Sequence, residues 1–396
     1  MAQATTNTTR ISIHEEAAYG EAPSGTGMQE LRYTGGSPIA AGKRTVQSET
    51  IKTNRNRQKP VIVAIEASGS MNFELMYGIT EHGVLFNGAL SSSVVAAAVA
   101  PVSLTVNAAA RTIVQGAGSF ITDGVVVGMW IRTYGFVNAG NNGVFKVSTV
   151  VALTITLDAA TTGLVNETGP GTTYLKGNML RNGTTKKSYL INRSFTDLTN
   201  VHDYANGMIV DSLSLSLESE SIITGSCSFQ GKEAKTSAAA VGGTLTNAGT
   251  TQPMTASVSV AQLLKNGAAF PAEVQSMSFE SGNNLRRLGH IGSKYPAGVN
   301  QGFFDFGGSL TAYLESLAMY DELINHTDTS FLVRLTDDPA GALAGNIIQL
   351  SVPFAVFTEG NIDVGGGNSE VTMPLRWSAF DGGLGYMVQV DMLPIT

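Results

Sequence analysis

Apolar and polar residues alternate along the stretch from Val61 to Leu75. Its odd positions are apolar apart from Gly69, and its even positions become polar from Glu66 onward. Successive side chains of a strand point to opposite faces, so a period of two predicts a strand with one buried and one wet face. The glycine leaves open either one long strand or two strands joined by a bulge.

The same alternation returns in three later stretches. Asp211–Glu218 places three leucines opposite serines and a glutamate, and Ser221–Gln230 and Phe304–Leu314 repeat this arrangement. We therefore predict several amphipathic strands of one design. Their polar positions are Ser212, Ser214, Ser216, Glu218, Ser226, Ser228, Gln230, Asp305 and Ser309.

Two of these strands lead into short helix candidates, Ile79–Leu90 and Glu315–Asn325. The tripeptide Gly69-Ser70-Met71 precedes the first helix, and Gly308-Ser309-Leu310 precedes the second. This parallel predicts two strand–strand–helix halves that share one sandwich or barrel.

The composition changes between residues 91 and 180, where short strand candidates are separated by turn signals. We interpret this stretch as a small all-β domain inserted into a host fold built from 1–90 and 181–396. Residues 1–30 read as an N-terminal arm. The predicted fold class is mainly β, a β-sandwich or barrel with one or two short flanking helices.

Composition narrows the function. Charged residues make up 14% of the 396-residue chain and the net charge is −7, which argues against a protein that neutralises nucleic-acid phosphates. A single cysteine excludes an intrachain disulfide. The N-terminus lacks a signal-peptide pattern and no apolar run is long enough for a membrane helix, so we expect synthesis in a host cytoplasm and no membrane partner.

Candidate chemistry is sparse. No two of the five histidines have the spacing of metal ligands on one helical turn. Asp305-Phe306-Gly307 matches a kinase tripeptide but lies within an alternating strand, and Cys227 alternates inward with Phe229, as a buried thiol would. We therefore predict no catalytic residue, no metal, no cofactor and no enzymatic activity.

Three segments carry a resemblance to a known family. They read KPVIVAIEASGSMNFEL, SFTDLTNVHDYANGMIVDSLSLSLESESIITGSCSFQGKEA and QGFFDFGGSLTAYLESLAMYDELINH. In their order along the chain and in their residue character, these segments resemble the major tail tube proteins of long-tailed bacteriophages. The resemblance implies a β-sandwich subunit that forms stacked hexameric rings in the virion tail, a hollow tube through which double-stranded DNA passes without binding. It also implies tape-measure, terminator and tip proteins as partners, and it places the inserted domain on the outside of the tube.

One polar face of the strands must then line the channel. We predict that the lumen-facing residues are Glu66, Ser68, Ser70, Glu74, Ser212, Ser214, Ser216, Glu218 and Asp305. An acidic, serine-rich wall would prevent phosphates from adhering. The alternative reading is that these carboxylates are ordinary exterior residues.

The most basic window of the chain, residues 35–60, is predicted to be a loop. Its cations are Lys43, Arg44, Lys52, Arg55, Arg57 and Lys59. The loop is either a solvated segment or, as the resemblance implies, a contact between stacked rings. Two other classes remain open for the whole chain: a different virion component, such as a capsid decoration or baseplate ring protein, and an adhesin-type or carbohydrate-binding β-protein.

Overall fold

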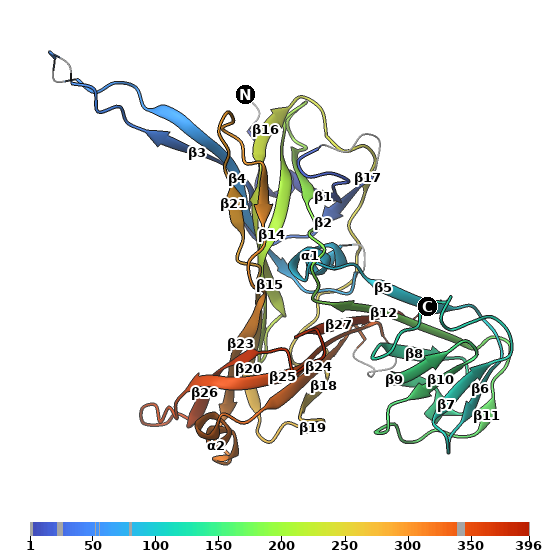
Figure 1. Ribbon diagram of the computed structural model, residues 1–396. Helices are drawn as coiled ribbons and strands as arrows, with labels where there is room; N and C mark the ends of the chain where they lie inside the picture. The colour runs from blue at the N-terminus through green and yellow to red at the C-terminus, as the bar shows by residue number, and fades with distance from the viewer. Residues whose placement is uncertain are drawn as a thin grey trace.

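The computed structural model describes residues 3–21, 27–51, 53–54, 56–78, 81–338 and 345–395. The protein is mainly β, with 49% of residues in strands and 6% in helices, which confirms the predicted fold class. The strands form two layers around a common core, and an arm projects from one end of the molecule (Figure 1).

The N-terminal half follows a short 3-10 turn at Thr6–Thr8. Its elements are β1 (Thr9–Glu15), β2 (Met28–Leu31), β3 (Gly35–Val46), β4 (Val61–Glu74), α1 (His82–Ala89), β13 (Tyr189–Phe195), β14 (His202–Glu218), β15 (Thr224–Gly231), β16 (Glu233–Ser237) and β17 (Leu245–Thr246). The strands of this half pair in the order β3-β4-β15-β14, and the long β14 bends so that its first part pairs with β13 and β16 in the second layer.

The C-terminal half continues the same sheet, because β20 pairs with the last part of β14. Its elements are β18 (Val260–Lys265), β19 (Ala268–Ala269), β20 (Val274–Gly282), β21 (Arg286–Leu288), β22 (Gly298–Asn300), β23 (Asp305–Tyr313), α2 (Ala318–Asn325), β24 (Thr329–Thr336), β25 (Ile347–Gly360), β26 (Thr372–Ala379) and β27 (Gln389–Leu393). One hydrophobic cluster runs through both halves.

The stretch between α1 and β13 has its own core. Its strands are β5 (Val95–Val99), β6 (Leu104–Asn107), β7 (Thr112–Gln115), β8 (Trp130–Tyr134), β9 (Gly143–Val151), β10 (Thr154–Leu157), β11 (Glu167–Thr168) and β12 (Tyr174–Arg181), with a 3-10 turn at Ala139–Asn141. Sixteen buried residues between Ala97 and Met179 form a second hydrophobic cluster. The stretch joins the rest through β12, which pairs with β27 in the second layer. Treating 91–180 as an inserted domain remains an interpretation.

The predicted loop at 35–60 is wrong for its first part. Residues 35–46 form β3, which pairs with β4 and builds the projecting arm (Figure 1). The sequence does not predict this strand because the outer part of the arm lies beyond the core. With no face buried there, apolar and polar residues do not alternate along it. For the same reason Val61 and Val63, predicted to face inward, are exposed, whereas Met71 and Phe73 are buried as predicted.

Both predicted helices exist and are shorter than expected. The first spans His82–Ala89 and the second Ala318–Asn325, while Ile79 lies outside the described residues. In α2, the chain leaves the helix at His326, whose φ of 52° is left-handed, and the backbone N–H of His326 donates to Leu323.

Candidate functional site

One continuous polar face covers the layer formed by β3, β4, β15, β14, β20, β23, β26 and β25. The strand registers align polar residues in rows across it. One row reads Ser70, Ser228, Ser212, Gly282 and Asp305; a second reads Asn72, Ser226, Ser214, Glu280, Gly307 and Ser378.

Serine hydroxyls on this face bind one another across strands. The Ser212 and Ser228 hydroxyl oxygens lie 2.6 Å apart, and those of Ser214 and Ser226 lie 2.8 Å apart. Such cross-strand pairs stabilise an antiparallel sheet by a few tenths of a kcal/mol to about 1 kcal/mol. They also use hydrogen-bonding capacity that would otherwise be offered to a passing molecule.

The opposite face of the same strands is apolar and buried. Leu213 and Leu215 alternate with the serines of β14 and pack into the core beside Phe279. Cys227 lies in the same layer at 1% exposure, as predicted, and burial raises the pKa of its thiol well above the usual range. A neutral, enclosed thiol is a packing residue. The polar face therefore rests on a close-packed support.

Most of the residues predicted to line a channel lie on this face. Ser68, Ser70, Ser212, Glu218 and Asp305 are exposed, and Glu74, Ser214 and Ser216 are partly exposed. The Asp305 carboxylate accepts a hydrogen bond of 2.6 Å from the Asn284 side chain.

Glu66 differs from the other carboxylates. It forms an ion pair with Arg287 of β21, at the base of the arm. Its charge is therefore balanced locally by Arg287, unlike the other predicted carboxylates.

Glu280, an exposed carboxylate in the middle of the face, was not among the residues predicted to line the channel. β20 reads VQSMSFESG, with Ser276, Ser278 and Glu280 alternating against Met277 and Phe279. The same alternation of apolar and polar residues predicted the strand at Asp211–Glu218, so the sequence contained the pattern that would have predicted β20 and the exposure of Glu280. Ser278 also pairs with Ser309 of β23 at 2.9 Å.

The arm presents cations and apolar side chains together. Lys43, Arg44, Arg57 and Lys59 are exposed, whereas Lys52 and Arg55 lie outside the described residues. Val46 and Val61 face each other across the arm and are 52% and 59% exposed. Exposed apolar residues on a two-stranded ribbon mark a contact surface.

A second, shorter projection lies against the base of the arm. It contains the β21–β22 pair and residues 289–297, and the Ile65 N–H donates to the Lys294 carbonyl at 2.8 Å. At 103% and 90% exposure, Ile291 and Phe303 extend into solvent beside it.

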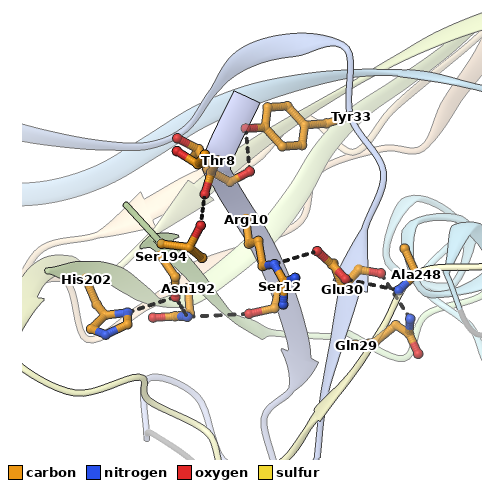
Figure 2. A network of polar contacts seen from close by, with 12 residues as sticks. Thr8, Arg10, Ser12, Gln29, Glu30, Tyr33, Asn192, Ser194, His202 and Ala248 are labelled. Carbon is orange, nitrogen blue, oxygen red and sulfur yellow. Dashed lines mark hydrogen bonds and ion pairs between the residues drawn. The ribbon is translucent and has the colours of Figure 1, made fainter. Parts of the chain in front are cut away.

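A serine–histidine contact lies in the second layer (Figure 2). The His202 ring nitrogen Nδ1 is 2.8 Å from the Ser194 hydroxyl, which also accepts a hydrogen bond from Asn192. Asp203 cannot complete a catalytic triad with them, because it binds Arg193 through two hydrogen bonds. The contact ties β13 to β14.

The described residues offer neither a metal site nor a membrane-spanning helix. Within them, no three His, Cys, Asp or Glu side chains gather as metal ligands would. None of the helices in the described ranges is long and apolar enough to cross a membrane. The polar face and the arm are therefore the features that call for a function.

The sequence matches a protein-family model over most of its length. Residues 6–379 match the model described as phage tail tube protein. No curated protein matches the sequence.

Proposed function

This chain belongs to the phage tail tube protein family and is a structural component of the virion tail, and we propose that its copies form a hollow tube with the polar face turned to the lumen. The observation that carries this proposal is the continuity of that face. In the row from Asn72 to Ser378 it spans six paired strands, from β4 to β26, without an apolar residue, and its other side is the core.

The chemistry of the face suits the passage of a polyanion. Glu74, Glu218 and Glu280 give it a negative character, and the cation Arg376 of β26 lies opposite the carboxylate Glu359 of β25. Lysine or arginine in the centre would bind phosphates and release counterions, and this would hold DNA in a salt-dependent way. A wall of serines and carboxylates repels the phosphates without binding them.

Closure of the sheet into a ring also solves a stability problem. A long, amphipathic sheet with open edges is a site of uncontrolled aggregation, whereas a barrel removes the edges. The family resemblance implies hexameric rings, with six sandwich subunits around such a lumen, and these rings stack into the tube.

The arm is the proposed contact between stacked rings. Its outer strands lack a core of their own, and Val46, Val61 and Val63 are exposed in this subunit. Burial against the next ring would remove this apolar surface from water, and the exposed Arg57 and Lys59 of the outer arm would meet the acidic surface of a protein whose net charge is −7.

The inserted domain is proposed to lie outside the tube. It is attached through β12 and β27 to the second layer, which does not carry the polar face (Figure 1). The ends of the tube would meet the tape-measure, terminator and tip proteins that the family resemblance implies.

Negative-stain electron microscopy of the purified protein tests the proposal. We expect long hollow tubes of uniform width, with projections on the outside. Rings or small oligomers that never stack, under conditions that drive polymerisation, would instead favour a decoration or baseplate protein.

A further inference from the structure

The two halves of the chain have one topology. Nine elements of the first half correspond, in chain order, to nine elements of the second half. In the first half they are β1, β2, β3, β4, α1, β13, β14, β15 and β16, and in the second half they are β18, β19, β20, β23, α2, β24, β25, β26 and β27. Their pairings match as well: β3-β4-β15-β14 corresponds to β20-β23-β26-β25, and β2-β1-β13-β14-β16 corresponds to β19-β18-β24-β25-β27.

Irregularities in the ladders repeat too. β14 shifts register against β15 between Val210 and Ser212, and β25 shifts against β26 between Phe357 and Glu359. In each case one residue of the longer strand, Asp211 in β14 and Thr358 in β25, has no partner in the ladder, and the two bulges lie between corresponding pairs of strands. Bulges are specific local features of a strand, so their agreement supports structural equivalence beyond the strand order.

The halves differ at their outer edges. The last part of β14 pairs with β15 on one side and with β20 of the second half on the other. The counterpart in the second half is the segment 359–363, which begins at the end of β25 and runs past it. On one side it stays paired, through Glu359 opposite Arg376, the Asn361 N–H that donates to the Pro374 carbonyl, and the Asp363–Thr372 bridge; on its other side there is no strand within the described residues. β3, the equivalent of β20, pairs only with β4 among the described strands.

We propose that the segment 359–363 in one chain, which begins at the end of β25, pairs antiparallel with β3 of the next chain, in the register of the internal junction between β14 and β20. This inference rests on the proposed tube function. The occupant of each open edge is a second copy of this chain, because the chain itself already shows the same two elements paired.

The register can be transferred residue by residue. Directly past the bulge, Ser212 lies opposite Ser228 in the first half, and Glu359 lies opposite Arg376 in the second. Ser212 and Glu359 are therefore equivalent positions, each on the polar side of its strand.

The partner strand is aligned in the same way. Gly42 lies opposite Glu66, four residues before Ser70, and Gly282 lies opposite Asp305, four residues before Ser309. Gly42 and Gly282 are thus equivalent.

Within the chain Ser212 faces Gly282, and Ser214 faces Glu280. Across the boundary between chains the corresponding pairs are Glu359 with Gly42 and Asn361 with Ala40.

The charges at the two edges are complementary. The segment 358–363 carries Glu359 and Asp363 with no cation, and β3 carries Lys43 and Arg44 with no acid. In this register Arg44 is a diagonal neighbour of Glu359 on the same face, within reach of a long side chain. Glu359, Asp363, Lys43 and Arg44 are all exposed in the isolated subunit.

The internal repeat also sets the number of chains. A ring of six sandwich units requires three chains, because each chain supplies two units, and its wall contains 24 strands. At a strand spacing of about 4.8 Å, 24 strands have a circumference of about 115 Å and a backbone diameter of about 37 Å before strand tilt widens it. Six chains would double this to about 73 Å, far wider than a DNA duplex requires. The ring is therefore a trimer of two-unit chains rather than a hexamer of chains.

Engineered cross-linking tests the interface. The pair Ala40→Cys and Asn361→Cys places two thiols directly opposite each other across the boundary, where the Cα atoms of opposed residues in antiparallel strands lie about 4.5–5.5 Å apart, within the Cα range of a disulfide. The native Cys227 is buried and takes no part. After mild oxidation of assembled tubes, we expect a non-reducing gel to show species of one, two and three chains and nothing larger.

Matched controls define the register. Each single substitution is expected to stay monomeric on the gel, and so is Val46→Cys combined with Asn361→Cys, because Val46 lies about 20 Å further along β3. Absence of cross-links in well-formed tubes, or a ladder that reaches six chains, would overturn the proposed interface.

End-on electron micrographs separate this inference from the tube function itself. Three inserted domains around each ring are expected. Six per ring would overturn the three-chain ring while leaving the tube function intact, whereas failure of the wild-type protein to form tubes would overturn both.

Discussion

Arg287 of β21 forms an ion pair with Glu66 of β4, and this contact joins two projections that occupy equivalent places in the two halves. In the first half the segment between β3 and β4 extends as the arm. In the second half the segment between β20 and β23 contains β21 and β22 and lies against the arm's base. The second projection therefore supports the base of the arm. Because Glu66 is paired there, the negative charge of the polar face comes from Glu74, Glu218 and Glu280, which lie closer to its centre.

The central carboxylates are expected to govern DNA passage. The double variant Glu218→Lys and Glu280→Lys should still assemble, because both side chains are exposed, but it should slow genome ejection severalfold at low salt, since each lysine attracts phosphates. Ejection can be followed by the fluorescence of a dye that binds released DNA.

The matched control is Glu218→Gln with Glu280→Gln, which removes charge without adding a cation and should have a much smaller effect. Slowing should diminish as salt increases. If the lysine variant ejects DNA at the wild-type rate from intact tails, the polar face does not line the lumen.

The tip of the arm is expected to control stacking. Replacing residues 47–60 with a two-residue turn keeps the β3–β4 ladder but removes the outermost cations. The variant should remain folded and form rings that do not polymerise. Sedimentation and electron microscopy measure this, and a variant in which the exposed segment 159–163 of the inserted stretch is shortened serves as a control away from the arm. Tubes of normal length from the tip deletion would contradict the stacking role.

The sequence predicted the strands that have one face buried in the core, because burial of one face produces alternating apolar and polar residues. The last part of β14, Asp211–Glu218, and the inner part of β4 alternate because one face of each is buried, and both were identified together with the side each residue takes; the first part of β14 is buried without alternation and was not predicted. β3 was missed because much of it pairs without a core beneath it. The repeat of the Gly-Ser-Met and Gly-Ser-Leu tripeptides indicated two related halves. It did not indicate that the halves are joined by the pairing of β14 with β20.

Contacts between distant residues left no local signal. Arg287 and Glu66 are separated by more than two hundred positions, and neither has a neighbour that marks it as paired. The serine pairs depend on register, which the bulge in β14 sets and the alternation alone does not. Glu280 is the exception, because its strand carries the same pattern as β14 and could have been found.

The aromatic cluster around Trp377 is expected to be a main source of stability. The Trp377 ring lies 5.6 Å from Phe279, 5.9 Å from Phe306 and 5.2 Å from Phe331, measured between ring centroids, and it is 2% exposed. Trp377→Ala should lower the free energy of unfolding by about 3–5 kcal/mol, because it leaves a cavity that rigid strands cannot close. Urea denaturation of the unpolymerised subunit measures the change.

Phe303→Ala is the matched control, because this ring is 90% exposed and its removal should change the free energy of unfolding by less than about 0.5 kcal/mol. A similar loss in both variants would show that the cluster does not stabilise the subunit in particular.

Asp391 should make the stability of the subunit depend on pH. Its carboxyl is fully buried in β27, where it accepts hydrogen bonds from the Trp130 backbone N–H at 3.3 Å and the Gln389 side chain at 2.8 Å, and burial raises its pKa to about 7. The folded state then binds a proton that the unfolded state has already lost above pH 4. The free energy of unfolding should therefore fall as pH rises from about 4 to 7, by on the order of 1 kcal/mol per unit, and level off above pH 7.

The variant Asp391→Asn removes the titrating group and keeps a side chain of the same shape. It should flatten this part of the stability–pH profile and unfold at higher urea than the wild type at pH 8. Because Trp130 lies in the inserted stretch and Gln389 in β27, the same carboxyl links the two hydrophobic clusters, so the effect should appear in the unfolding of both. Denaturation curves at pH 5, 6, 7 and 8, followed by tryptophan fluorescence, measure it. Parallel profiles for the two proteins would show that Asp391 stays ionised in the folded subunit across this range.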